Sequence, residues 1–186
     1  KDRNFAKNLR QITGFIPVHL SLYKRAFTHK SIKGKKGQTD KYPSNNERLE
    51  YLGDAILDSV TAEYLFRKYP LHDEGFLTQM RSKMVNRKSL NDIAAKMQLD
   101  LFLMERGSSR ISQTMMGNTF EAFVGAIYLD VGYEKTRRFI IKRMLLQYMD
   151  VHELETLNTN YKSQLLEYSQ KNQKTITYEL LNHYRT

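Results

Sequence analysis

The chain contains no cysteine, and this absence removes several kinds of chemistry at once. It can form no disulfide, no thiolate zinc site and no cysteine nucleophile. No apolar run approaches the roughly 18 residues needed to span a bilayer, and no signal-peptide pattern opens the chain. We therefore expect a soluble, cytoplasmic protein with no membrane partner.

Three familiar catalytic patterns are missing as well. The stretch GKKGQT, residues 34–39, does not satisfy GxxxxGK[ST], the pattern of a phosphate-binding loop, and no serine lies in a GxSxG context. The five histidines show no metal-ligand spacing, and His29 is expected to be structural. These absences argue against P-loop nucleotide hydrolysis, serine esterase chemistry and a histidine-ligated metal.

What the chain has in excess is positive charge. Its net charge is +10, from 30 Lys and Arg against 20 Asp and Glu, and its sequence pI is about 9.6. Such a balance favours a polyanionic partner, most often nucleic acid or a membrane surface. Charge alone does not choose between them, because many soluble proteins are basic.

Within this basic chain one segment is acidic. NERLEYLGDAILD, residues 46–58, carries carboxylates at spacings of three, four and four: Glu47, Glu50, Asp54 and Asp58. At about 100° per residue these fall within a strip about 80° wide, opposite an apolar face. Like charges at these spacings destabilise a helix, so basic partners or a cation should offset the repulsion. The other interpretation is an ordinary amphipathic helix with a solvated acidic face.

A second segment, GNTFEAFVGAIYLD at 117–130, offers matching groups. Asn118 and Glu121 lie three residues apart on one side of its predicted helix, together with Gly125, and small residues there permit close approach of another helix. If the two helices meet along these faces, three carboxylates and one amide converge: Glu50, Asp54, Glu121 and Asn118. An all-oxygen site of this kind suits Mg²⁺. A buried, hydrogen-bonded polar cluster is the alternative.

Helical periodicity dominates the first 150 residues, and no strand is predicted there. The predicted helices span 4–13, 18–27, 47–69, 73–90 with a break near Asn86, 90–97, 101–105, 114–133 and 134–148. Asn45 or Asn46 is expected to cap the third of these. Residues 1–150 are therefore predicted to form one all-α domain.

The rest of the chain has a different pattern. Residues 151–160 are predicted to be a linker, 161–171 a helix, and 175–181, TITYELL, a strand because of its alternation and β-branched residues. A single strand is not stable alone in water. We therefore expect the natural protein to continue past Thr186.

Several of these segments resemble the ribonuclease III family. NERLEYLGDAIL is similar to the family's signature, NERLEFLGD followed by a small and an aliphatic residue. Further similar motifs occur in the right order: RAFTHKS at 25–31, DEGFLTQMRSKMVNRKSL at 73–90 and FEAFVGAIYLD at 120–130. The tail NYKSQLLEYSQKNQKTITYEL resembles the start of a double-stranded RNA-binding domain. The resemblance implies an all-α, ribonuclease III-type helical nuclease domain over 1–150, followed by a truncated α/β double-stranded RNA-binding domain over 161–186.

The resemblance also implies roles for individual residues. The family's metal-binding positions correspond to Glu50, Asp54, Asn118 and Glu121. Asp54 and Glu121 would be the catalytic residues, holding metal and orienting water. Glu47 and Glu74 match secondary acidic positions associated with the catalytic valley and dimer contacts. Tyr51 matches the aromatic residue that packs into the partner subunit of a homodimer, and its hydroxyl, absent from the usual Phe, needs a partner or a wet edge.

The implied activity is that of a metal-dependent endoribonuclease. A homodimer would use Mg²⁺, with Mn²⁺ as a substitute, to cut double-stranded RNA into products with 5′-phosphate and 3′-hydroxyl ends, in the processing of ribosomal and other RNA. Gln164 and Glu167 match positions that meet the RNA minor groove. Candidate basic contacts are Lys30, Lys33, Lys35, Lys36, Arg81, Lys83, Arg87, Lys88, Arg106 and Arg110. An exposed helix face is predicted instead for Arg137, Arg138, Lys142 and Arg143.

The sequence departs from the family pattern at Asn118, where Asp is usual. An amide still offers a carbonyl oxygen but no negative charge, so we expect weaker Mg²⁺ binding. Either the site works as a natural variant, or it is disabled and the protein only binds double-stranded RNA. An unrelated helical interaction module is a third hypothesis, and it predicts neither metal nor RNA binding.

Overall fold

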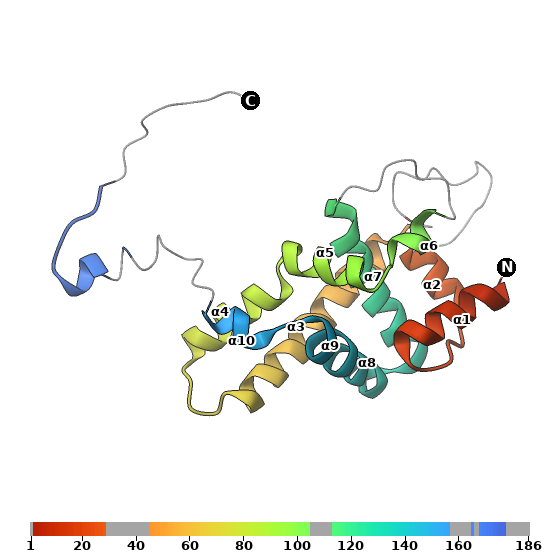
Figure 1. Ribbon diagram of the computed structural model, residues 1–186, viewed down its shortest axis with the longest axis horizontal. Coiled ribbons are helices and arrows are strands. Elements are labelled where there is room, and N and C mark those ends of the chain that lie inside the picture. The colour runs from red at the N-terminus through yellow and green to blue at the C-terminus, as the bar shows by residue number, and fades with distance from the viewer. Residues whose placement is uncertain (1, 29–44, 105–112, 157–164, 166–167, 178–186) are drawn as a thin grey trace, which may run out of the picture. The chain divides into compact units, whose positions relative to one another are not determined.

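The structure, a computed structural model, describes residues 2–28, 45–104, 113–156, 165 and 168–177 (Figure 1). It contains two compact units, Lys1–Leu154 and Glu155–Thr186. Every helix in the described ranges is too short or too polar to cross a membrane.

The described residues form helices and no strand, which confirms the predicted all-α class. The helices are α1 (Asp2–Thr13), α2 (Leu20–Ala26), α3 (Glu47–Lys68), α4 (Glu74–Val85), α5 (Arg87–Lys96), α6 (Asp100–Met104), α7 (Gln113–Val131), α8 (Tyr133–Phe139), the π-helix η1 (Ile140–Leu145), α9 (Leu146–Tyr148) and α10 (Val151–Thr156). The single helix predicted over 134–148 is thus a continuous run of α8, η1 and α9, with a π-helical middle.

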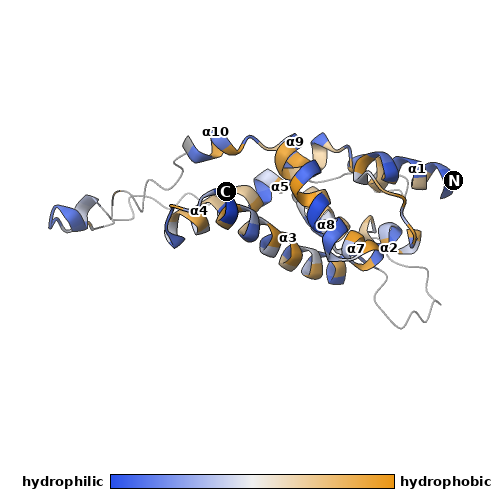
Figure 2. Ribbon diagram, turned by 90° about the horizontal axis from the view of Figure 1, so that it is seen from below, coloured by the Kyte–Doolittle hydropathy of each residue, from blue (hydrophilic) through white to orange (hydrophobic). Residues whose placement is uncertain are grey.

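Helix α7 lies at the centre of the first unit and packs against α3, α5 and α2. Its residues 122–127 are all buried, because other helices cover it on several sides. The outer helices bury only one side, and hydrophobic and hydrophilic residues alternate along their ribbons (Figure 2). A fully buried helix must be apolar nearly all round, which is why polar residues of α7 stand out as candidates for function.

The contact between α3 and α7 is made by backbone. A Cβ atom added to Gly53 would overlap the carbonyl oxygen of Glu121, and one added to Gly125 would overlap the carbonyl oxygen of Leu49. Both glycines are buried. No side chain can therefore separate the two helices here, and the position of Glu121 beside α3 is set by the main chain.

The predicted helix start at Asp73 and the predicted break near Asn86 both coincide with capping side chains. The Asp73 side chain accepts a hydrogen bond from the N–H of Phe76 at 2.9 Å. The Asn86 side chain accepts one from the N–H of Ser89 at 2.9 Å, so the break predicted near Asn86 is the junction between α4 and α5. In each case the side chain satisfies a backbone donor that the first turn leaves without an intrahelical acceptor.

The predicted cap of α3 is wrong. Asn46 occupies the N-cap position, but its side chain makes no capping hydrogen bond. Its backbone already has helical angles, φ −85° and ψ −10°, whereas a capping side chain reaches its target from extended angles. Instead the N–H of Asn46 donates to the carbonyl oxygen of Thr28 at 3.0 Å, which joins the start of α3 to the end of α2.

The predicted linker over 151–160 begins as a helix, α10. The Asp150 side chain accepts a hydrogen bond from the N–H of Glu153 at 3.0 Å, and Val151 is buried. A cap and an apolar contact together stabilise this turn, which the polar composition of the segment did not suggest.

The tail agrees with the sequence in part. Within the helix predicted over 161–171, residue 165 and residues 168–171 are helical. Of the strand predicted over 175–181, residues 175–177 have no regular structure and the others lie outside the described part. The domain limits stay a prediction.

A buried carboxylate joins the end of α7 to the start of α2. The Asp130 side chain is fully buried. It accepts hydrogen bonds from the N–H groups of Val18 and His19 at 3.0 and 2.7 Å, and from the Tyr23 hydroxyl at 2.7 Å. It also lies 2.8 Å from the Nδ1 atom of His19. Burial alone would raise the pKa of Asp130, but these hydrogen bonds hold it below its usual range.

We expect Asp130→Ala to lower the free energy of unfolding by about 2–4 kcal/mol, because it leaves buried donors unpaired. Urea unfolding at pH 7 measures the loss. The pKa of Asp130 is lower in the folded than in the unfolded protein. The contribution of this carboxylate to stability is therefore fully present above the unfolded pKa, and it is lost as the pH falls through the folded pKa. The gap between wild type and variant should therefore shrink in acid. Asp92→Ala, at an exposed position of α5, is the control and should change little.

Candidate metal centre

The acidic residues Glu50, Asp54 and Asp58 of α3 lie beside the part of the helix that contacts α7 at Gly53. Glu50 and Asp58 are half-buried and Asp54 is exposed. Partial desolvation, followed by repulsion from Asp58, raises the pKa of Asp54 above its usual value. The strip predicted from the sequence is therefore present, and its carboxylates act on one another.

Glu121 of α7 belongs to the same group of charges. Burial is the largest cause that raises the pKa of Glu121 to about 7, and repulsion by Asp54 and Glu50 adds to it. The cation of Arg87 offsets part of the effect. Residues from α3 and α7, far apart in the sequence, thus share one electrostatic environment. A cation placed among them would relieve the repulsion.

Among the described residues, no three His, Asp or Glu side chains come close enough to one another to hold a metal ion. The acids of α3 and α7 share a surface but do not converge on one point. The donor set nevertheless fits a hard cation, because it offers only carboxylate and amide oxygens and Mg²⁺ keeps several of its own waters. The ligand set Glu50, Asp54, Asn118 and Glu121 stays a prediction.

Asn118 lies one helical turn before Glu121 and is half-buried. The turn that carries it is anchored to α5, because the N–H of Gly117 donates to the Asn91 side-chain oxygen at 2.7 Å. A side chain at Gly117 would press on that oxygen at 3.0 Å. Asn91 was not among the residues predicted at this site, since a single amide on another helix carries no local signal.

Arg87 also lines a hollow of about 570 Å³ beside the start of α7. Its other lining residues are Lys88, Asn91, Asp92, Ala95 and Met116. Two of the predicted basic contacts, Arg87 and Lys88, thus lie on α5 next to the helix that carries Glu121. Lys83 is engaged elsewhere, since its ammonium group donates to the carbonyl oxygen of Leu154 at 2.9 Å.

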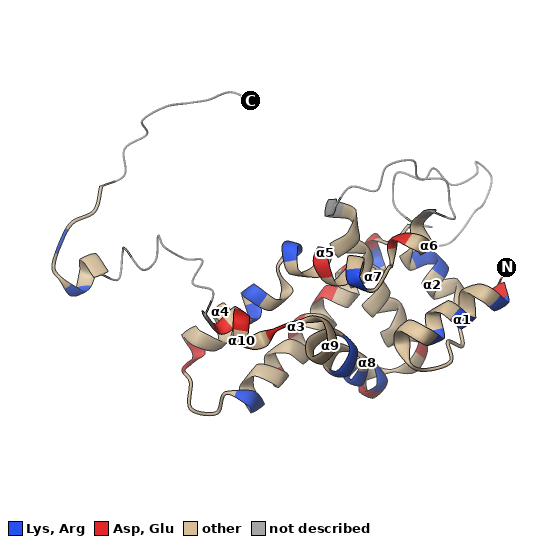
Figure 3. Cartoon of the chain, viewed as in Figure 1, with Lys and Arg blue, Asp and Glu red and all other residues tan. Residues whose placement is uncertain are grey.

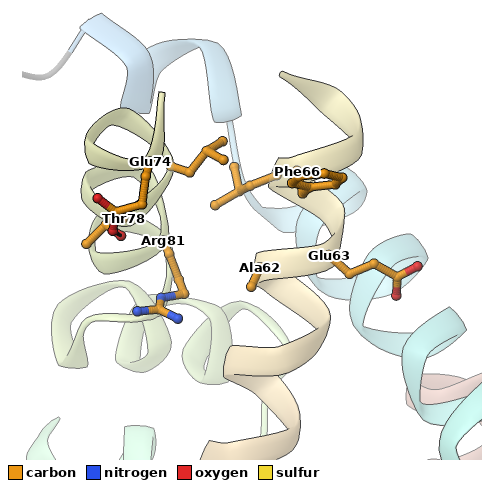
Figure 4. A pocket seen from close by; sticks show the side chains of 8 residues that line it. Ala62, Glu63, Phe66, Glu74, Thr78 and Arg81 are labelled. Atoms are coloured by element: carbon orange, nitrogen blue, oxygen red, sulfur yellow. Dashed lines mark hydrogen bonds between the residues drawn. The ribbon is translucent and has the colours of Figure 1, made fainter. Parts of the chain in front are cut away.

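Glu74 lies at a second hollow, between α3 and α4. Its volume is about 360 Å³, and it is lined by Ala62, Glu63, Leu65, Phe66, Glu74, Leu77, Thr78 and Arg81. The close-up shows Phe66 of α3 opposite Thr78 and Arg81 of α4, while the carboxylate of Glu63 points away (Figure 4). The Thr78 hydroxyl donates to Glu74 at 2.8 Å. Glu74 is therefore part of a mostly apolar pocket.

The remaining predicted residues fall into two groups. Glu47 is exposed at the first turn of α3 and accepts a hydrogen bond from Asn45 at 2.9 Å. Tyr51 is 82% exposed. Outside the described residues lie the candidate RNA contacts Lys30, Lys33, Lys35, Lys36, Arg106, Arg110, Gln164 and Glu167.

The position predicted for Arg137 is wrong. This residue was predicted to lie on an exposed helix face, but it is half-buried and bound to Glu63 of α3 by two hydrogen bonds of 2.8 and 3.1 Å. The pair holds α8 against α3. Its partner is 74 residues earlier in the chain, a distance at which helical periodicity gives no information.

Comparison with known proteins agrees with this architecture. The family described as Ribonuclease-III-like matches residues 20–148. The protein named "Ribonuclease 3" of Zunongwangia profunda is 44% identical over 181 residues, which cover 97% of this chain and 74% of that protein. The proteins of the same name from Bacteroides thetaiotaomicron and Bacteroides fragilis (strain YCH46) are 41% and 43% identical. This chain spans 59% and 62% of their respective lengths.

Comparison with solved structures also supports this fold. A nuclease domain of ribonuclease III from Campylobacter jejuni, described as having structural flexibility in a region involved in dimer formation, superposes with a TM-score of 0.63 at 35% sequence identity. The match covers 73% of this chain and 93% of that domain. A Dicer from Giardia intestinalis has the same fold, with a TM-score of 0.59 at 23% identity.

Proposed function

Because this chain belongs to the ribonuclease III family, we propose that it is a metal-dependent endoribonuclease that hydrolyses double-stranded RNA. The observation that carries the proposal is the common environment of Glu50, Asp54 and Glu121, where repulsion and burial raise the pKa of Glu121 to about 7. Evenly solvated surface acids would not show such a shift. Acids that repel one another beside a contact fixed by backbone would be stabilised by a bound cation.

Glu50, Asp54, Asn118 and Glu121 would hold Mg²⁺, or Mn²⁺ in its place. A bound ion supplies an activated water and neutralises charge on the phosphate and the leaving oxygen. Asp54 and Glu121 would orient the attacking water from the two helices. Glu50 and Asn118 would complete the ligand set, directly or through water. Glu47 would contribute negative charge at the edge of the same strip.

Recognition would rest on duplex shape and not on base identity. Arg87 and Lys88, beside the start of α7, would contact phosphates near the acids, and the predicted contacts Lys30, Arg106, Gln164 and Glu167 would extend the surface. Residues 161–186 would begin a double-stranded RNA-binding domain. The products would carry 5′-phosphate and 3′-hydroxyl ends, and the substrates would include precursors of ribosomal RNA in the cytoplasm.

Two copies of the chain would form a homodimer through α3. Tyr51 is an exposed aromatic near one end of this helix, and the apolar pocket that includes Phe66 and Glu74 lies near its other end. In a twofold arrangement the same patch serves both subunits. Antiparallel packing of two α3 helices would bring the Tyr51 ring of each copy to the pocket of the other.

We expect Tyr51→Ala to convert the dimer into monomers, because the ring supplies most of the apolar area that would fill the pocket. Thr78→Trp, which fills the pocket from the other side, should do the same. Sedimentation velocity over a range of protein concentrations measures the change. The control is Leu146→Ala, an exposed apolar residue of α9. A dimer that survives both pocket substitutions would exclude this interface.

The function is tested by incubating the chain with long duplex RNA at fixed low salt, with Mg²⁺, with Mn²⁺ or with a chelator. Salt must be held constant because phosphate contacts make binding strongly salt-dependent. We expect cleavage of duplex RNA with either ion, none with chelator, and none of single-stranded RNA or duplex DNA. Absence of cleavage in every condition would overturn the proposal.

Asn118 favours a second candidate, a protein that binds double-stranded RNA without cutting it, because an amide gives the site one formal charge fewer than the family's usual Asp. The variant Asn118→Asp separates the two. If both proteins cleave, and the variant needs less Mg²⁺, Asn118 is a working ligand. If only the variant cleaves, the natural chain is a binding protein.

A further inference from the structure

A third pocket, of about 250 Å³, lies where the turn after α1 meets α8 and η1. Its lining residues are Thr13, Gly14, Phe15, Lys135, Arg138, Phe139, Lys142 and Arg143. It shares no residue with α3 or α7, so it is separate from the candidate metal centre. Four of the eight lining residues are cations and none is an acid.

These four cations have no acidic partner in the described part of the chain. The guanidinium of Arg143 makes a 3.3 Å hydrogen bond to Gln147, which is neutral. The neighbouring Arg137 is the contrast, because its charge is matched by Glu63 across a tight contact. Lys and Arg gather on α8 (Figure 3). Like charges at close helical spacing destabilise a helix, so an anion would be stabilising here.

The π-helix brings two of the cations together. At the end of η1 the N–H of Leu146 bonds to the carbonyl oxygen of Ile141, five residues earlier. Residues five apart therefore lie nearly above one another, as residues four apart do in an α-helix. Arg138 and Arg143 are five apart. An uninterrupted α-helix would turn Arg143 away from Arg138, whereas the wider turn lets both line the pocket.

The opposite wall is the turn Thr13–Gly14–Phe15, whose middle residue has no side chain. Gly14 has φ +81°, a conformation that residues with a Cβ rarely adopt. The Arg143 guanidinium lies against it, 3.3 Å from the place that a Cβ would occupy. The Thr13 hydroxyl turns inward and donates to the carbonyl oxygen of Leu9 at 2.8 Å. The wall therefore leaves the pocket open and adds no negative charge.

We propose that this pocket binds phosphate groups. Its volume lies below the roughly 300–1,000 Å³ of ordinary small-ligand sites, which suits one or two phosphates and not a whole nucleotide. Arg138 and Arg143 offer planar, forked donors that match phosphate oxygens, and Lys135 and Lys142 add point charges. The phosphates come either from a free polyphosphate or from the RNA backbone. The second source rests on the proposed function, and the first does not.

The test compares two double variants of the full chain with equal loss of charge. Arg138→Gln/Lys142→Gln removes two exposed pocket cations, and Lys7→Gln/Arg10→Gln removes two exposed cations of α1 that do not line the pocket. Calorimetry measures binding of inorganic tripolyphosphate, without divalent ions. Fluorescence anisotropy measures binding of a labelled duplex RNA over a series of salt concentrations. Circular dichroism confirms that both variants are folded.

We expect the pocket variant to bind tripolyphosphate at least about tenfold more weakly than the α1 variant does. If tripolyphosphate does not bind to wild type, but the slope of log K against log salt falls by about two units in the pocket variant only, the phosphates are those of RNA. A charge-conserving variant, Arg138→Lys/Lys142→Arg, should retain binding. Equal effects of both double variants, or none, would overturn the proposal. Failure to cleave RNA would leave the tripolyphosphate result standing.

Discussion

Glu121→Gln should reduce cleavage of duplex RNA by at least about a thousandfold, the largest effect on activity that we expect from a single substitution. The change keeps the shape of the side chain and removes its charge. Glu121 is a proposed ligand, and repulsion by Asp54 and Glu50 helps to raise its pKa. A thousandfold loss corresponds to about 4 kcal/mol of transition-state stabilisation, a size typical of losing one essential electrostatic contact.

The same variant should be more stable than wild type at alkaline pH without divalent ions. The pKa of Glu121 is raised from 4.5 to about 7 in the folded state. Folded protein therefore binds more protons than unfolded protein between these values, and stability falls as the pH rises through this window. Gln cannot ionise, so the variant escapes the loss. Thermal unfolding at pH 5 and pH 8 measures the difference, with Glu134→Gln on the exposed part of α8 as control.

Mg²⁺ should then raise the melting temperature of wild type and have little effect on Glu121→Gln, because a ligand stabilises only the state that binds it. The two readouts separate chemistry from folding. A variant that cleaves normally would remove Glu121 from the site. A variant that is inactive and also less stable than wild type at pH 8 would show that the side chain supports the fold instead.

The second large effect is expected from Gly53→Ala. The added methyl group would occupy the space of the Glu121 carbonyl oxygen, and backbone cannot yield as a flexible side chain can. The helices must separate, which disturbs the packing of α7 on α3 along their length. We expect a loss of at least about 3 kcal/mol in the free energy of unfolding, together with loss of cleavage. Urea unfolding followed by circular dichroism gives the first quantity directly.

Gly75→Ala is the matched control. Gly75 lies exposed in the first turn of α4, and its added Cβ would meet only a side-chain oxygen of Asp73 at 3.6 Å. Because alanine favours helix over glycine by about 0.5–1 kcal/mol, this variant should be as stable as wild type or slightly more so. Equal stability of Gly53→Ala and Gly75→Ala would mean that α3 and α7 are not in backbone contact.

Local patterns predicted much of this structure. The acidic strip, the helix that carries Asn118 and Glu121, the helix start at Asp73 and the break near Asn86 follow from spacing and from the chemistry of short polar side chains. The small residue at Gly125 was recognised as a place of close approach. Its counterpart Gly53 was not, because one glycine inside the acidic strip has no periodic signal until a partner helix is known.

The wrong predictions for Asn46 and Arg137 have the same cause. Asn46 does not cap α3 because its backbone, joined to Thr28 by a hydrogen bond, already has helical angles, and Arg137 is not an exposed cation because Glu63 lies opposite. Each partner is distant in sequence, so neither contact could be found from residues near one another. The pocket beside Gly14 likewise depends on a π-helical turn, which a period of 3.6 residues does not anticipate.

The backbone contact at Gly53 and Gly125 has a consequence for how the protein should respond to heat. Side-chain layers between helices can loosen gradually, but two main chains in contact have no such layer to soften. The relative placement of the acidic residues on α3 and α7 should therefore persist until the helices part altogether. We expect heat inactivation to coincide with global melting. At no temperature should the protein be folded while the acidic residues of α3 and α7 are displaced from one another.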